Sequence, residues 1–167
     1  MKPNRLNSRR ELLTLALLGG SSLLAREALG AGVCADGAPG SKLLDMYIAA
    51  VNARDLNAFA AFTAENYIQH SGRSPNGLAA LVETFRGVFA RMPDVQMRAE
   101  DRIIAGDRVV SRMVLAATHT QPLQGIAPTG RRFELRTIDI WRVENGKFAE
   151  HWDIVDFPGL LKQLKNE

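Results

Sequence analysis

Residues 41–92 show the apolar spacing of amphipathic helices. From Ser41, which suits an N-cap, apolar side chains recur on one helical stripe, and Asp55 is placed to cap a second, short helix. Ser74-Pro75 predicts the start of a third helix, because proline suits the first helical turn, and Pro93 predicts its end. The apolar stripe of this third helix comprises Leu78, Leu81, Val82, Phe85, Phe89 and Met92.

After Pro93 the pattern changes to the apolar–polar alternation of β-strands. Gly106-Asp107 predicts a turn, and Asn145-Gly146 is a strong signal for a two-residue hairpin loop. The segments assigned to strands are 95–103, 109–119, 132–143 and 148–157. Three helices followed by a four-stranded antiparallel meander predict a single α+β domain. A curved sheet wrapped around its helices would leave an apolar pocket between the two layers.

Residues 1–35 have the organisation of an export signal. Arg9-Arg10 precedes an apolar run to Ala25 that is too short and too interrupted to span a bilayer, and Val33-Cys34-Ala35 offers a cleavage site. The segment resembles the bacterial twin-arginine signal. We therefore expect a mature domain of residues 36–167 that is periplasmic or secreted, with no membrane span after signal removal. The alternative is an amphipathic N-terminal helix that belongs to the fold.

Charge and cysteine content narrow the functional classes. The net charge of +3 belongs to residues 1–35, which hold five basic and two acidic residues and leave 16 of each for residues 36–167. A neutral body argues against a nucleic-acid partner. Cleavage after Ala35 would remove Cys34, the only cysteine, and with it both thiol catalysis and disulfides.

One carboxylate lies on an otherwise apolar strand face. Asp139 alternates in phase with Phe133, Leu135, Thr137, Trp141 and Val143. Burial favours the protonated form of a carboxyl group, so such an Asp can act as an acid or base near neutral pH. The alternative is a structural Asp paired with an Arg or a backbone N–H.

The Asn145-Gly146 turn allows the register of the last hairpin to be predicted. A two-residue loop pairs Glu144 with Lys147, which places Asp139, Trp141, Glu150 and Trp152 on one surface. His151 and Asp153 would then lie on the other face. A single bulge would exchange the two sets, because a slip of one residue reverses every side chain.

Further pocket candidates come from the other segments. Met113 lies on the apolar face of segment 109–119, His119 ends that face, and His70 lies between the second and third helices. The alternatives are a loop residue bonded to backbone for His70 and a rim residue for His119.

The sequence offers no motif for other chemistries. Its three histidines lack metal-ligand spacing, so we expect no metal, and it has neither a nucleophile elbow nor a glycine-rich phosphate loop. Epoxide hydrolysis would need an Asp-Arg-Asp arrangement, but Arg136 and Arg142 lie on the face opposite Asp139.

Several short segments together resemble one protein family. They are Asp55-Leu56-Asn57-Ala58-Phe59, Tyr67-Ile68-Gln69-His70, Pro128-Thr129-Gly130-Arg131-Arg132, Thr137-Ile138-Asp139-Ile140-Trp141-Arg142-Val143, Asn145-Gly146-Lys147 and Glu150-His151-Trp152-Asp153. In this order they are similar to the SnoaL-like polyketide cyclases of the nuclear transport factor 2-like superfamily, over about residues 41–165.

The resemblance implies a cone-shaped α+β barrel, with three N-terminal helices packed on a curved antiparallel sheet, that forms a homodimer through the sheet. It also implies an intramolecular aldol condensation without a cofactor, with Asp139 as acid/base and His119 as a second polar pocket residue. The expected ligand is a small apolar or aromatic molecule with a carbonyl group. The alternative function is a periplasmic carrier or sensor that binds such a ligand without turnover.

Overall fold

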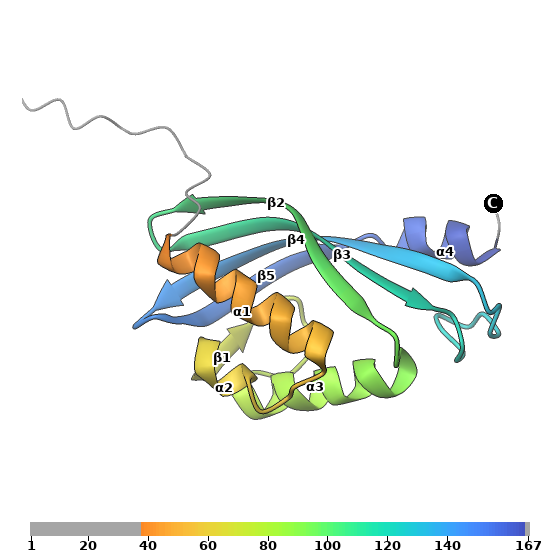
Figure 1. The fold of residues 1–167 in the computed structure, drawn as a ribbon, viewed down its shortest axis with the longest axis horizontal. Coiled ribbons are helices and arrows are strands. Elements are labelled where there is room, and N and C mark those ends of the chain that lie inside the picture. The colour runs from red at the N-terminus through yellow and green to blue at the C-terminus, as the bar shows by residue number, and fades with distance from the viewer. Residues whose placement is uncertain (1–37, 166–167) are drawn as a thin grey trace, which may run out of the picture. The chain divides into compact units, whose positions relative to one another are not determined.

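The computed structural model describes residues 38–165, which form four helices and a five-stranded sheet (Figure 1). The helices are α1 (Pro39–Ala53), α2 (Phe59–Phe62), α3 (Leu78–Arg91) and α4 (Phe157–Lys165). The strands are β1 (Thr63–Gln69), β2 (Gln96–Ala105), β3 (Arg108–Thr118), β4 (Arg132–Glu144) and β5 (Lys147–Val155). The expected export signal, residues 1–35, lies outside the described residues.

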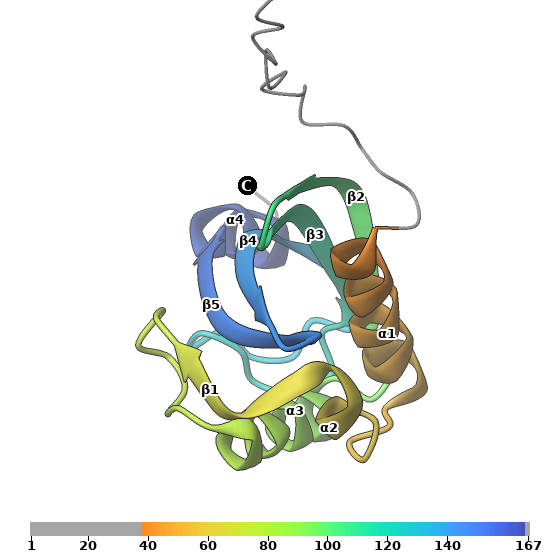
Figure 2. The same cartoon turned by 90° about the vertical axis from the view of Figure 1, so that its left-hand side faces the viewer.

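The strand order β1-β5-β4-β3-β2 confirms the predicted meander and adds one strand to it. β1 pairs in parallel with β5, so the sheet is mixed rather than wholly antiparallel. The sequence did not indicate this strand, because only Thr63 and Tyr67 of its seven residues are buried and the alternation is weak. The sheet is strongly curved but not closed into a barrel, since β1 and β2 remain its edges (Figure 2).

The helices line the concave side of the sheet. Figure 2 shows α1 beside β2 and β3, with α2 and α3 lying below the curved strands. α4 lies at the end of the domain opposite α2 (Figure 1). Tyr47 of α1 makes edge-on ring contacts with Phe59, Phe62, Phe85 and Trp141, so one aromatic cluster joins these helices to β4. Leu160 and Leu164 of α4 close a second, smaller core around Phe133.

Two predicted helix starts are displaced in the structure. α1 begins at Pro39, and Ser41 lies inside the helix with its hydroxyl bonded to Arg102, so it is not the N-cap. α3 begins at Leu78 after Gly77, whose φ of 98° favours glycine, and Ser74 instead bonds to Thr84. Asp55 does cap the turn before α2, because its carboxylate accepts the N–H of Asn57 at 3.0 Å.

The predicted alternation of β2 fails beyond its midpoint. A bulge between Ala99 and Asp101 shifts the register against β3. As a result Asp101 and Ile103 face outward instead of sharing the inner face with Met97, and Ile103 is 49% exposed.

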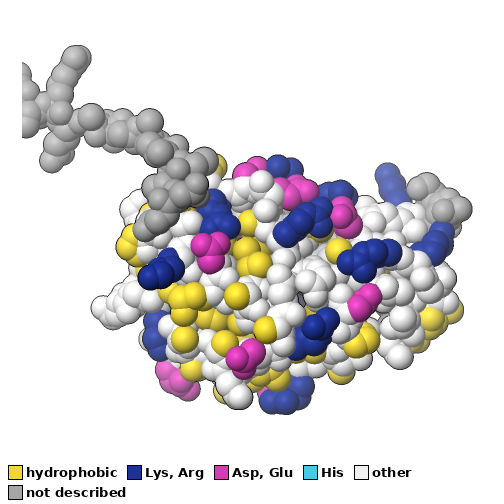
Figure 3. Space-filling view, viewed as in Figure 1, with side chains coloured by type: hydrophobic (Ala, Val, Ile, Leu, Met, Phe, Trp, Pro, Cys, Tyr) yellow, Lys and Arg dark blue, Asp and Glu magenta, His cyan; other side chains and the backbone are white. Residues whose placement is uncertain are grey.

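The surface carries charges of both signs. Figure 3 shows Lys, Arg, Asp and Glu side chains interspersed over the face that bears α1 and β2, with apolar atoms gathered over α1 and α2. Among the described residues, no helix combines the length and the hydropathy that crossing a membrane requires.

Candidate active site

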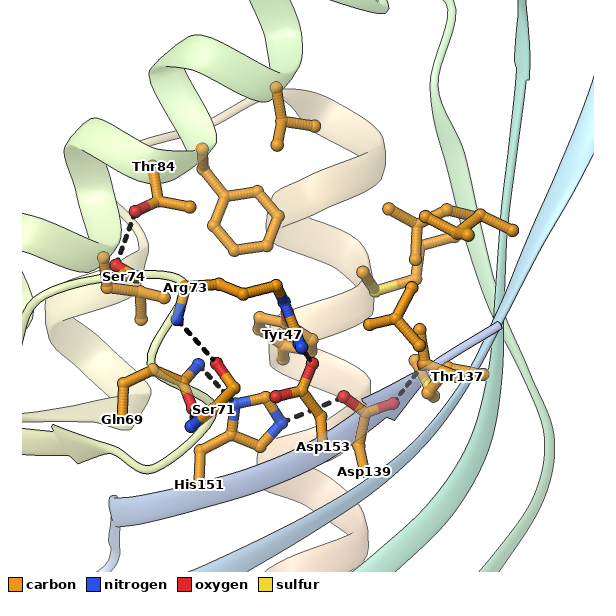
Figure 4. Close-up of a pocket in the computed structure, with 18 of the residues that line it drawn as sticks. Tyr47, Gln69, Ser71, Arg73, Ser74, Thr84, Thr137, Asp139, His151 and Asp153 are labelled. Carbon is orange, nitrogen blue, oxygen red and sulfur yellow. Dashed lines mark hydrogen bonds and ion pairs between the residues drawn. The ribbon is translucent and has the colours of Figure 1, made fainter. Parts of the chain in front are cut away.

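A cavity of about 200 Å³ lies between the concave face of the sheet and helices α1 and α3 (Figure 4). Most of its wall is apolar, formed by Leu81, Phe85, Val88, Met97, Met113, Leu115, Leu135, Val155 and Phe157. Its polar part is formed by Tyr47, Gln69, Ser71, Arg73, Ser74, Thr84, Thr137, Asp139, His151 and Asp153. An apolar wall with a few converging polar groups is typical of a site for a small organic ligand.

Asp139 and His151 form a buried hydrogen-bonded pair in this polar part. His151 Nε2 lies 2.9 Å from Asp139 Oδ1, and the two side chains are only 7% and 9% exposed. Thr137 donates its hydroxyl to Asp139 Oδ2. Both oxygens of the Asp139 carboxylate are therefore engaged by protein donors, which lowers the cost of burying its charge.

Gln69 at the end of β1 holds the other side of the His151 ring. Its amide Nε2 lies 2.9 Å from His151 Nδ1, and its Oε1 accepts the N–H of Ser71 at 3.3 Å. The parallel pairing of β1 with β5 brings Gln69 directly beside His151. The ring also stacks on Trp141, with 4.8 Å between centroids and an interplanar angle of 6°.

Asp153 lies on β5 directly opposite Asp139 on β4. Its Oδ2 forms an ion pair with Arg73, which comes from the loop between β1 and α3. The Asp153 side chain is 8% exposed, and its Oδ1 is buried without a hydrogen-bond partner among the described residues. A buried acceptor without a partner is uncommon, and Asp153 also lines the cavity, so this oxygen is a candidate for a functional role.

Two tyrosines beside the pair are held in their neutral form. Burial raises the pKa of the Tyr47 hydroxyl well above 10, and the negative charge of Asp139 raises it further. The pKa of Tyr67 is raised by the same two causes, in the same order. Tyr47 lines the cavity, so its hydroxyl keeps a proton to donate at any physiological pH.

Three of these residues have the geometry of potential metal ligands. Asp139, His151 and Asp153 each offer a ligand atom, and these atoms lie within 4.8 Å of one another. His151 and Asp139 already bond to each other, and Asp153 pairs with Arg73. Because Asp153 Oδ1 has no partner among the described residues, a cation at this position would have to displace existing bonds of His151 and Asp139.

The predicted register of the last hairpin is wrong beyond its first two pairs. Glu144 pairs with Lys147 and Val143 with Phe148 as expected, but Arg142 then pairs with Glu150. Ala149 is the extra residue, and it turns His151 and Asp153 inward. Glu150 and Trp152 are consequently on the outer face, so the alternative that a bulge exchanges the two sets is the one observed.

His70 also lies on the outer face and not in the cavity. Its ring stacks on Trp152 with 4.3 Å between centroids, and its Nε2 lies 2.8 Å from Glu150 Oε2. The bond to His70, and then the bond to Arg142, lowers the pKa of the Glu150 carboxyl. His70, Glu150 and Arg142 thus form a polar cluster on the outer side of the sheet.

His119 is remote from Asp139. Asp139 pairs with Ser111, and His119 comes eight residues later, roughly 25 Å farther at the rise of an extended strand. It lines a separate, small cavity, and its Nδ1 faces the hydroxyl of Thr129 at 3.0 Å. The expected partnership of His119 with Asp139 is therefore not formed.

The remaining candidates divide between core and cavity. Met113 lines the cavity, whereas Trp141 is 1% exposed and belongs to the aromatic core behind His151.

Sequence reasoning did not propose Tyr47, Gln69 or Arg73 for the site. Tyr47 lies on the apolar stripe of the first helix, and the other two come from the segment between the second and third helices, for which the pattern predicts no element. The Tyr67-Ile68-Gln69-His70 segment carried part of the family resemblance and was the available signal for Gln69.

Known proteins similar to this chain include methyl ester cyclases. A nogalonic acid methyl ester cyclase from Streptomyces nogalater is 38% identical over 98 residues, which is 57% of this chain and 68% of that protein. An aklanonic acid methyl ester cyclase from Streptomyces peucetius is 30% identical over 93 residues, 55% of this chain and 62% of that protein. The chain thus matches about two thirds or less of the length of these relatives.

Solved structures and the family model agree with this similarity. TsrD from Streptomyces laurentii has a TM-score of 0.71 and 30% identity, covering 78% of this chain and 97% of TsrD. The model of the SnoaL-like polyketide cyclases matches residues 41–164, most of the chain. This chain therefore belongs to the SnoaL-like polyketide cyclase family.

Proposed function

We propose that this protein is a cofactor-independent cyclase that closes a ring by intramolecular aldol condensation. The expected substrate is an apolar or aromatic molecule with an acidic C–H next to a carbonyl and a second carbonyl within reach. The observation that carries the proposal is the Asp153 side chain, which lines an apolar cavity and whose buried Oδ1 has no hydrogen-bond partner among the described residues. The names of the relatives supply the substrate class, the methyl esters of nogalonic or aklanonic acid.

The two carboxylates differ in their freedom to take a proton. Asp139 accepts hydrogen bonds on both oxygens, from His151 and Thr137, whereas Asp153 uses only Oδ2 in its ion pair with Arg73. A general base needs an accepting lone pair directed at the substrate. We therefore assign proton abstraction to Asp153 Oδ1, and Asp139, the candidate from the sequence, becomes the neighbouring charge held by His151.

The reaction balances without an oxidant or a reductant. Asp153 removes the proton next to the first carbonyl, and the electron pair of that C–H bond forms an enolate. The enolate carbon then bonds to the second carbonyl carbon, and the resulting alkoxide takes the proton back from Asp153. Tyr47 and Arg73 line the cavity and are the available donors for the enolate oxygen, a role typically worth about 3–4 kcal/mol per donor.

The test is product formation from the two methyl esters by purified protein without added cofactor. We expect Asp153→Asn to lower turnover by about 10²–10⁴-fold, the usual contribution of a general base, with ligand affinity retained. Asp139→Asn should lower turnover less, and Asp107→Asn, in the exposed turn between β2 and β3, serves as the control.

The outcomes separate the proposals. A larger loss in Asp139→Asn than in Asp153→Asn would return the base to Asp139. Binding of the esters without any cyclised product would overturn the cyclase and leave the alternative, a non-catalytic carrier of apolar ligands.

We further propose that a second copy of the chain covers an apolar patch on the outer face of the sheet, formed by Ile138, Ile140, Trp152 and Ile154. Ile138 and Ile154 are neighbours in register and are 53% and 75% exposed. These side chains line an open hollow of about 390 Å³. An exposed apolar patch of this kind is typical of an interface.

We also propose that residues 1–35 direct the protein out of the cytoplasm through the twin-arginine route and are then removed. The support is the sequence of that segment, in which Arg9-Arg10 precedes an apolar run and a small-residue cleavage site. The mature domain would then act in the periplasm or outside the cell.

A further inference from the structure

The hydrogen-bond directions around His151 follow from a single backbone group. The Ser71 N–H can only donate, and it meets Gln69 Oε1 at 3.3 Å. This contact places the amide oxygen of Gln69 toward Ser71 and its NH₂ group toward His151 (Figure 4). An NH₂ group can only donate, so His151 Nδ1 must accept.

The position of the imidazole proton follows. A neutral ring that accepts at Nδ1 carries its hydrogen on Nε2, which lies 2.9 Å from Asp139 Oδ1. His151 therefore donates to Asp139 Oδ1, and that oxygen accepts. The opposite tautomer would turn the Nε2 lone pair toward Asp139 and require the proton to be on the carboxyl group instead.

We propose that Gln69 is a positioning residue that holds His151 in the Nε2–H tautomer and thereby keeps Asp139 Oδ1 a hydrogen-bond acceptor. His151 then orients a carboxylate and does not carry a proton in the reaction, because both of its ring nitrogens are engaged. The ring also stacks on Trp141 with 4.8 Å and on Tyr67 with 6.4 Å between centroids, and these contacts restrict its rotation.

The Nε2–H tautomer of His151 has a consequence for Asp153, the proposed general base. Because Asp139 Oδ1 accepts from His151 and Oδ2 accepts from Thr137, Asp139 does not donate to Asp153, which lies opposite it in the sheet. Asp153 Oδ1 therefore keeps no hydrogen-bond partner among the described residues. This consequence rests on the proposed cyclase function, whereas the tautomer itself does not.

The first test needs no substrate. Nitrogen NMR of the imidazole rings distinguishes protonated from unprotonated nitrogens, and the chain has three histidines, which His70→Gln and His119→Gln variants would assign. We expect His151 to have an unprotonated Nδ1 and a protonated Nε2. A protonated Nδ1 in the unaltered protein would overturn the proposal.

Variants at Gln69 test whether this residue determines the tautomer of His151. In Gln69→Glu one oxygen still accepts from Ser71 and the other faces Nδ1, so Nδ1 should become protonated. Gln69→Met retains the bulk without the donor and should give both tautomers in exchange. The control is Gln96→Glu, which adds the same charge at an exposed position on β2 and should leave the His151 resonances unchanged. Identical His151 resonances in all four proteins would overturn the role of Gln69.

Activity supplies the second readout. Gln69→Glu should lower turnover of a cyclised ester by about 10–100-fold, the usual effect of losing the partner that orients a site histidine, with little change in ligand affinity. If the NMR result holds but no protein forms product, the tautomer assignment stands and the cyclase proposal fails. A turnover unchanged in Gln69→Glu, despite an altered tautomer, would overturn the positioning role.

Discussion

Asp139 on β4 and Asp153 on β5 are paired directly across the sheet, and both side chains face the same cavity. They share a face only because Ala149 is an extra residue in β5. The hairpin begins in the register set by the Asn145-Gly146 turn, and the bulge then moves every later residue of β5 by one position. The polar part of the site thus depends on a residue that takes no part in its chemistry.

Deletion of Ala149 should remove the bulge and leave the inner and outer faces of β5 unchanged. Phe148, which pairs with Val143, would then directly precede Glu150, which pairs with Arg142, so His151 and Asp153 would still face inward. We expect the free energy of unfolding to fall by no more than about 1 kcal/mol, the loss of one buried methyl group. Denaturant unfolding measures this change.

Ala149→Gly is the matched control for the deletion, because it keeps the residue count and hence the bulge. It should cost only about 0.5–1 kcal/mol, as glycine does within a strand. A deletion variant far less stable than this control would contradict the assignment of Ala149 as the extra, unpaired residue of β5.

The two tyrosines predict a loss of stability at alkaline pH. Tyr47 and Tyr67 are the only tyrosines of the chain, and burial, followed by the charge of Asp139, raises both pKa values in the folded state. The unfolded chain loses these protons above about pH 10 and the folded chain keeps them, so their contribution is complete below that pH and decreases above it. The free energy of unfolding should fall by about 2.7 kcal/mol per pH unit once both ionise in the unfolded state.

Tyrosinate absorbance, followed together with circular dichroism, provides the measurement. The absorbance should rise only as the protein unfolds. A titration near pH 10 in protein that keeps its native dichroism would show that at least one of the two hydroxyls is accessible to solvent.

The outer-face patch predicts the oligomeric state. Ile154→Arg places a charge at the most exposed of its isoleucines and should convert a dimer to a monomer without loss of secondary structure. Sedimentation equilibrium measures the mass. Ile103→Arg, at another exposed isoleucine on β2, is the control and should remain dimeric. An unaltered protein that stays monomeric at high concentration would rule out this interface.

The twin-arginine assignment predicts the effect of a charge-conserving change. Replacing Arg9 and Arg10 together by Lys should leave the protein in the cytoplasm with residues 1–35 attached, because a receptor that recognises the guanidinium does not accept an ammonium. Cell fractionation and N-terminal sequencing report the result. Undiminished export of the double variant would assign the protein to a different route.

Local pattern alone determined much of this protein. The stripe of α3, the alternation of β3 and β4 and the Asn145-Gly146 turn follow from side-chain periodicity and turn chemistry, which act over a few residues. These signals predicted the α+β class, the order of most elements and a buried Asp139 facing inward. They also named His151 and Asp153, but only as the outcome of a bulge.

Tertiary structure decided the rest, because the deciding contacts join residues distant in the chain. The parallel pairing of β1 with β5 places Gln69 beside His151, 82 positions later, and the loop after β1 brings Arg73 to Asp153. The bulge at Ala149 is tolerated because its exchange of faces buries His151 against Trp141 and leaves Glu150 with Arg142 outside. Local periodicity does not distinguish the two registers, because both have the same alternation. They differ only in which side chains face the helices that pack on the sheet.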